Sequence, residues 1–207
     1  MSITRPTFVA IFVTAAGTAG AERMNFDNQP VGEAPSGWVC GVTGAGSAQW
    51  RVEADPQAPS PPNVLTQRGR ADFAWCVHDA ALSEDGIVAV RFKPMAGKED
   101  QAGGVVWRWK DANTYYVARA NALENNVSLY YVTGGVRRTL QYRPAPVAAN
   151  AWHRIEVRFQ GTRIQVLLDD KPYIELMDTR IAEAGKAGVW TKADSVTSFD
   201  DFQLSRD

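Results

Sequence analysis

The stretch "NAWHRIEVRFQGTRIQVLLDDKPYIE", residues 150–175, contains two short segments in which apolar and polar side chains alternate. The apolar members are Ile155, Val157 and Phe159 in the first segment, and Ile164, Val166 and Leu168 in the second. Because side chains point to opposite faces of a strand in turn, each segment predicts a half-buried antiparallel strand. The "QGT" between them predicts a tight hairpin turn at Gly161.

The same period-2 pattern continues outside this hairpin. "DGIVAVRFKP" (85–94) places three apolar residues on one face and two basic ones on the other. About a dozen such segments follow one another at the spacing typical of an all-β sandwich. The proline-rich stretch 55–63 is interpreted as a surface loop, because too little chain precedes it to fold alone. Residues 22–207 are therefore predicted to form a single domain.

The first 21 residues have the character of a secretory signal peptide. A weakly basic start at Arg5 precedes the short apolar run 7–20, and small residues close the segment at 19–21. The run is too short and too rich in small residues for a membrane span, and no later stretch is apolar enough to cross a bilayer. We expect a periplasmic or extracellular protein whose mature chain has no membrane span. An uncleaved N-terminal anchor is the alternative.

Composition excludes some classes of partner and leaves the state of the cysteines open. The formal net charge of −1 argues against a broad nucleic-acid-binding surface. In 207 residues the core is large enough that no cofactor is required for folding. Cys40 and Cys76 are the only cysteines. In an exported chain they are candidates for a disulfide, and two buried thiols are the alternative.

The hairpin at 150–175 resembles the Trp-His-x-Val-x-Val hairpin of concanavalin A-like jelly rolls, including laminin G-like domains. Asp170 stands where that family usually has glycine. "GVWTKADSVTSFDDFQL" (188–204) resembles the end of such domains, whose last strand pairs with an N-terminal strand, here the one bearing "FDN" (26–28). Residues 103–132 resemble secreted bacterial domains grouped near 3-keto-disaccharide hydrolases and family 16 glycoside hydrolases. The resemblance implies an all-β jelly-roll sandwich of two antiparallel sheets.

The catalytic motif of the family 16 enzymes is absent. Those glucanases carry Glu-x-Asp-x-x-Glu on one strand, and retaining hydrolysis needs two carboxyl groups about 5 Å apart. "SEDGIV" and "LLDDKPYIE" come nearest, and neither has the spacing. A hydrolase or lyase would need carboxylates from different strands, for which Glu124 and Asp194 are the candidates.

Strand parity predicts a ligand-binding face. In "YYVARAN" one face carries Tyr115, Val117, Arg119 and Asn121, and in "NVSLYYV" one face carries Asn126, Ser128 and Tyr130. The linking "NALENN" is typical of a hairpin turn. The same parity puts Arg108 beside Val106 and puts Trp109 on the other side. The predicted set is Arg108, Arg119, Asn121, Asn126, Tyr130, Trp190 and Lys192. Aromatic rings next to arginine and asparagine suit an oligo- or polysaccharide on a concave sheet face. A solvated face with arginine stems over aromatics is the alternative.

The resemblance also implies a structural calcium ion between the first and last strands, with Asp27 and Asp200 as candidate ligands and Asp201 beside them. Hydrogen bonds within turns are the alternative for these carboxylates. The sequence thus predicts a secreted carbohydrate-binding domain. A glycoside hydrolase or lyase using the same groove and a laminin G-like protein-interaction module are the competing hypotheses.

Overall fold

The computed structural model describes residues 22–206, which form fifteen strands and no helix. The predicted signal segment 1–21 lies outside these residues, and within them no helix is long and apolar enough to cross a membrane. The strands are β1 (Glu22–Met24), β2 (Trp38–Ser47), β3 (Trp50–Ala54), β4 (Asn63–Gln67), β5 (Arg70–Ser83), β6 (Gly86–Ala96), β7 (Ala102–Asp111), β8 (Thr114–Asn121), β9 (Asn126–Thr133), β10 (Val136–Pro144), β11 (His153–Gln160), β12 (Arg163–Leu168), β13 (Lys171–Met177), β14 (Gly185–Ala193) and β15 (Val196–Arg206).

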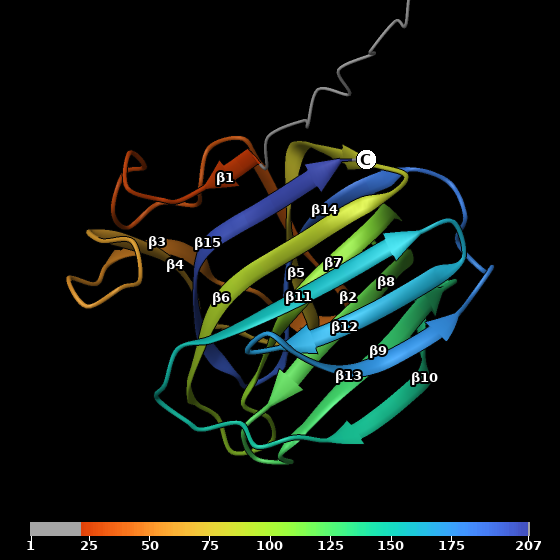
Figure 1. Ribbon diagram of the computed structural model, residues 1–207. Helices are drawn as coiled ribbons and strands as arrows, with labels where there is room; N and C mark the ends of the chain where they lie inside the picture. Colours follow the sequence, from red (N-terminus) through yellow and green to blue (C-terminus); the bar gives the residue numbers. More distant parts are fainter. Residues whose placement is uncertain (1–21, 207) are drawn as a thin grey trace, which may run out of the picture.

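The strands form two antiparallel sheets stacked face to face, as Figure 1 shows. Sheet A has the order β13-β12-β11-β6-β15-β4-β3, with β1 added beside β15. Sheet B has the order β10-β9-β8-β7-β14-β5-β2. This is the architecture of a jelly-roll sandwich, so the predicted fold class is confirmed.

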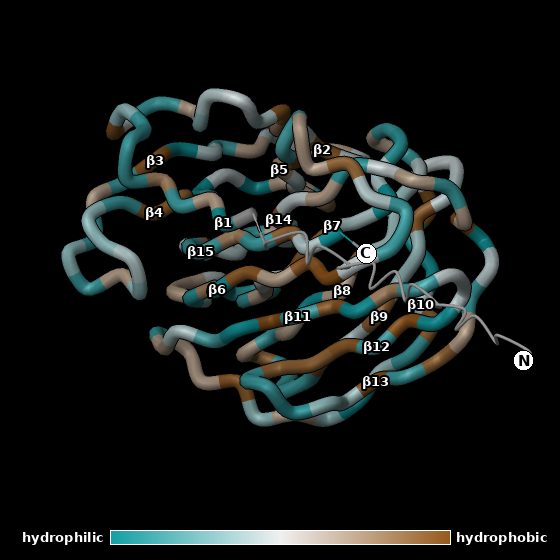
Figure 2. The backbone as a smooth tube through the Cα atoms, turned by 45° about the horizontal axis from the view of Figure 1, so that its top comes forward, coloured by the Kyte–Doolittle hydropathy of each residue, from teal (hydrophilic) through white to brown (hydrophobic). Residues whose placement is uncertain are grey.

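Alternation along the strands builds the core between the sheets. The hairpin β11–β12 pairs Val157 with Val166, and both side chains are fully buried. Figure 2 shows hydrophobic positions interleaved with hydrophilic ones along these strands. The last two positions before Lys171, Asp169 and Asp170, have φ of +49° and +63°. Positive φ at both central residues is the backbone of a type I′ hairpin turn.

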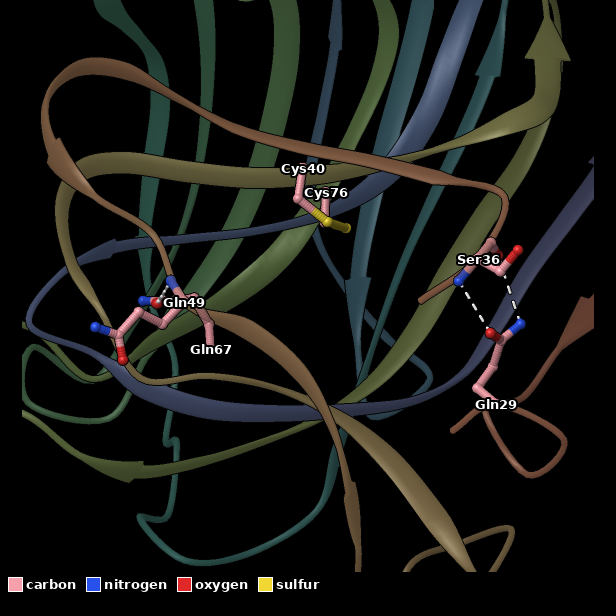
Figure 3. The surroundings of a disulfide bond; sticks show 6 residues. All are labelled: Gln29, Ser36, Cys40, Gln49, Gln67 and Cys76. Carbon is pink, nitrogen blue, oxygen red and sulfur yellow. Dashed lines mark hydrogen bonds between the residues drawn. A yellow bond between two sulfur atoms is a disulfide. The ribbon is translucent and has the colours of Figure 1, made fainter. Parts of the chain in front are cut away.

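Cys40 and Cys76 lie directly opposite each other on β2 and β5 and form a disulfide (Figure 3). β2 is the edge strand of sheet B and is paired on one side, by β5. The segment before β2 is fastened by hydrogen bonds between Gln29 and Ser36, which are drawn in the same view. The disulfide therefore ties an edge strand to the strand that carries part of the site described next.

Candidate functional site

Sheet B carries a second group of aromatic side chains on the face that points away from the core. We call it the outer-face cluster. Its members are Trp75, Val77, Val106, Tyr115, Val117, Tyr130, Val132 and Trp190, with Phe73, Trp109 and Ala112 partly buried against them. Alternation explains the separation, because neighbours on the same strands, such as Tyr116 and Leu129, belong to the core.

Ring stacking gives this cluster two layers. Phe73 stacks on the fully buried Trp190, with 5.8 Å between ring centroids and 19° between planes. Trp109 packs on Trp75 at 5.0 Å. The Trp75 ring lies across Gly41, where an added Cβ would come within 2.6 Å of the ring. Phe73 and Trp109 therefore form the half-exposed surface of the cluster, and the rings below them are a rigid support.

A buried carboxylate, Asp100, connects this aromatic surface to the basic residues beside it. Asp100 is fully buried and lies in the loop between β6 and β7. One of its oxygens accepts hydrogen bonds from Arg119 Nη1, at 3.2 Å, and from Asn121 Nδ2. The other oxygen accepts a hydrogen bond from Lys192 Nζ at 2.5 Å. A carboxylate removed from water needs such partners, so this network fixes the strands and the loop together.

Glu124 completes the network from the β8–β9 turn. Its Oε2 accepts hydrogen bonds from Arg119 Nη2 at 2.9 Å and from Asn126 Nδ2 at 2.6 Å. Partial burial raises the pKa of Glu124, but Asn126 and Arg119 outweigh it and hold the pKa below its ordinary value. Arg119 also donates to the Tyr130 hydroxyl at 3.2 Å. The turn "NALENN" is thus part of a polar network as well as a connection.

Arg137, on β10, lies over the aromatic rings. It pairs in register with Val132, a member of the outer-face cluster, so both face the same way. Its guanidinium carbon is 4.3 Å from the centroid of the Tyr130 ring, 4.7 Å from that of Phe73 and 5.8 Å from that of Trp190. The pKa of the Arg137 guanidinium is lowered from its ordinary value, mainly because burial penalises the charged form.

The structure brings six of the seven predicted binding residues together and separates the seventh. Arg108 does not share a face with Val106, because β7 contains a bulge. Arg108 has φ of +46°, and the pairing with β8 jumps there from Trp107 to Asp111. The bulge reverses the parity and turns Trp109 onto the outer face.

Arg108 instead points between the sheets. It donates hydrogen bonds to the carbonyl oxygens of Glu84, Ile181 and Gly161 at 3.0, 2.8 and 2.8 Å. Its guanidinium carbon lies 5.6 Å from the centroid of Phe159, a core residue. These contacts fasten loops at one end of the sandwich and leave Arg108 outside the candidate site.

Exposure divides the six remaining residues by role. Trp190, Asn121 and Asn126 are fully buried, and Arg119 and Tyr130 nearly so. The Lys192 side chain keeps 28% of its surface exposed. The accessible surface thus consists of Lys192, Glu124 and three further residues that strand parity did not predict. They are Phe73, Trp109 and Arg137. In the sequence, Phe73 stands two residues before Trp75 and Trp109 two residues after Trp107, and Arg137 is the second residue after the Gly-Gly pair of a turn.

Asp194, the second candidate acid–base residue, organises a loop. Its carboxylate accepts hydrogen bonds from the backbone N–H groups of Lys98, Glu99 and Asp100, at 2.7, 3.0 and 3.1 Å. Burial raises the pKa of Asp194, but these donors outweigh it and lower the pKa. This positions Asp100 for the network.

The predicted calcium ligands lie on or beside sheet A, where β1 pairs with β15. Asp200 is fully buried and accepts hydrogen bonds from the backbone N–H groups of Ser60 and Asp201, and Asp27 accepts one from Asn63. Asp201 pairs with two arginines instead. Among residues 22–206 no three histidine, cysteine or acidic side chains are grouped to hold a metal ion. Asp27 and Asp200 alone fall short of a calcium shell, which takes six to eight oxygen ligands.

No protein-family model matches this sequence, and no curated protein matches it. Solved structures do match. The carbohydrate-binding module CBM66 from Bacillus subtilis superposes with a TM-score of 0.65 at 19% identity, covering 82% of this chain and 96% of that one. The Ca²⁺/Man-bound VIP36 exoplasmic/lumenal domain gives 0.57 at 12%, covering 89% and 88%. The Bacillus licheniformis beta-glucanase gives 0.54 at 13%, covering 93% and 99%. The chain therefore has the concanavalin A-like jelly-roll fold.

Proposed function

We propose that this protein is an exported carbohydrate-binding domain whose site is the outer face of sheet B. The observation that carries the proposal is the half-exposed ring of Phe73 beside Arg137, in a cluster whose other half-exposed ring is Trp109. The polar network that holds Lys192 and Glu124 adjoins this cluster at Tyr130. An aromatic ring packs against the C–H face of a pyranose, and charged or amide groups bind its hydroxyls. The solved carbohydrate-binding module and lectin of the same fold support this choice.

The two carboxylates considered for acid–base work favour binding over hydrolysis. Glu124 is held by Arg119 and Asn126, and Asp194 by three backbone donors. Both have a lowered pKa, which suits a fixed anion better than a general acid. A hydrolase on the same face remains an outcome that the experiment must be able to detect.

A glycan array followed by calorimetry on the hits tests the proposal. We expect saturable binding, lowered about tenfold by Trp109→Ala and by Phe73→Ala, because each removes a stacking ring. Met177→Ala is the control, since Met177 is highly exposed on sheet A. Release of reducing sugar that Glu124→Gln stops would identify a hydrolase instead. A blank array would contradict sugar binding and favour a protein-interaction module.

The proposal includes export of this chain to the periplasm or the medium. The disulfide between Cys40 and Cys76 supports it, because such bonds persist in oxidising compartments. Cell fractionation with mass spectrometry of the N-terminus is the test. We expect the chain in the periplasm or medium to begin at or near residue 22, whereas an intact residue 1 on a membrane fraction would indicate an anchor.

Calcium is tested through Asp200. Burial raises the pKa of this carboxylate to about 6, and the charges of Asp201 and Asp27 add to the rise. Because the folded state binds the proton of Asp200 more tightly than the unfolded state does, protonation of Asp200 contributes to the free energy of unfolding. This contribution is full below about pH 4 and is lost as pH rises through 6. In EDTA, the wild type should therefore lose stability over this range relative to Asp200→Asn. A calcium ligand would show a Tm raised by calcium at pH 7 in the wild type alone.

A further inference from the structure

Arg137 stands apart from Arg119 and Lys192 because no carboxylate of the described residues forms an ion pair with it, although the charge of Asp100 acts on it from a distance. Arg119 is paired with Asp100 and Glu124, and Lys192 is paired with Asp100. Among residues 22–206, the guanidinium of Arg137 forms no ion pair and no hydrogen bond. The three cationic side chains Arg119, Lys192 and Arg137 thus lie near two carboxylates, Asp100 and Glu124, and the charge left without an ion pair is that of Arg137.

The aromatic surroundings hold this charge in one place. Tyr130, Phe73 and Trp190 all present rings within 6 Å of the guanidinium carbon, the range of cation–π attraction. Arginine stays charged when partly buried, and its flat guanidinium stacks on rings while its edge stays free to donate. Arg137 is thus a preorganised cation and not a mobile surface side chain.

The donors of Arg137 lack partners. Nη1 is sealed from solvent without a hydrogen bond to the described residues. The side chain as a whole is half-buried, so its remaining N–H groups are neither sealed nor hydrogen-bonded within the chain. A buried cation with unmet donors is costly, and an anionic group on a ligand would satisfy it.

We infer that Arg137 binds the anionic substituent of an acidic glycan, with the sugar ring on Phe73 and Trp109. This rests on the proposed carbohydrate-binding function and adds the class of sugar. The shared chemistry is a planar or tetrahedral oxyanion that accepts two N–H donors, as the carboxylate of a uronic acid or a sulfate ester does. The aromatic rings beside Arg137 also exclude water, which strengthens such a contact.

Binding is measured by calorimetry with matched ligands. Oligogalacturonate is compared with its methyl-esterified form, and sulfated dextran with dextran, so that carboxylate and sulfate are distinguished from neutral sugar. We expect the wild type to bind one anionic ligand and Arg137→Gln to bind it about tenfold to a hundredfold more weakly. Arg137→Lys keeps the charge without the paired donors, so an intermediate loss is expected.

Arg138→Gln is the matched control, since Arg138 is the exposed neighbour that faces Tyr131 on the other side of the strand. Equal losses in both glutamine variants would indicate diffuse charge attraction and overturn the inference. Wild-type binding of neutral sugars that Arg137→Gln leaves unchanged would overturn it too, while the proposed function would stand. Binding of no glycan at all would refute both. Thermal unfolding of each variant verifies the fold, and Arg137→Lys carries the test if Arg137→Gln is unfolded.

Discussion

Asp100 shows how one residue sets the geometry of the outer face. It joins Arg119 on β8 to Lys192 on β14, two strands separated in sheet B by β7. Strand parity predicted that Arg119 and Asn121 share a face, because a strand has a fixed period. It did not predict Asp100, since the path of the loop 97–101 depends on hydrogen bonds to Asp194 that no local pattern encodes.

Replacing Asp100 tests this role. Asp100→Asn should lower the free energy of unfolding by about 3 kcal/mol, because it leaves Arg119 buried with less compensation. Urea unfolding measures the change. Glu99→Gln is the control, since the pair of Glu99 with Arg70 is exposed to solvent and should contribute little to the free energy of unfolding. Equal effects of the two variants would show that Asp100 is not the centre of the network.

At the scale of strands, the sequence predicts which segments are extended better than it predicts their irregularities. β11 and β12 follow from their alternation and form the expected hairpin. β7 does not keep its period, because the bulge at Arg108 reverses the parity of Trp109. The bulge fits against Gly185 on β14, where an added Cβ would lie 2.3 Å from Arg108 backbone. That is a contact between distant segments, so no local signal announces it.

The β12–β13 turn allows a prediction at this scale. Asp170 occupies a left-handed position where glycine is the least strained residue. Asp170→Gly should therefore be more stable than Asp170→Ala by about 1 kcal/mol in urea unfolding. The exposed pair of Asp170 with Arg154 is lost in both variants, so it cancels. An alanine variant as stable as the glycine variant would mean that the turn relaxes to another type.

At the scale of the whole molecule, the fold could be predicted from the sequence more fully than the candidate site could. The reason is that the core and the outer face of sheet B depend on different features of the chain. The core uses one face of every strand, and its apolar positions recur with a period that the sequence displays. The outer face of sheet B combines residues from β5, β7, β8, β9, β10 and β14 whose adjacency depends on strand order. Strand order is set by long-range pairing, so Phe73 and Arg137 meet without any shared motif.

The disulfide contributes to the stability of the whole molecule, since it links the edge strand β2 to the rest of sheet B. Cys40 and Cys76 are 36 residues apart in sequence, and closing a loop of that size restricts the unfolded chain. The double variant Cys40→Ala with Cys76→Ala should lose about 3–4 kcal/mol in the free energy of unfolding. β2 would remain paired with β5, because Thr43 still bonds Tyr115 and Trp75 across the sheet.

Urea unfolding of the double variant and of the oxidised and reduced wild type measures this effect. The reduced wild type lacks only the covalent link, whereas the double variant also lacks the two sulfur atoms. We expect the two to unfold at nearly the same urea concentration, because the covalent link makes the larger contribution. Near-ultraviolet circular dichroism should keep the signal of the packed tryptophans of the outer-face cluster in both. A change below about 1 kcal/mol would show that pairing alone holds β2, and that the unfolded chain is already compact around these strands.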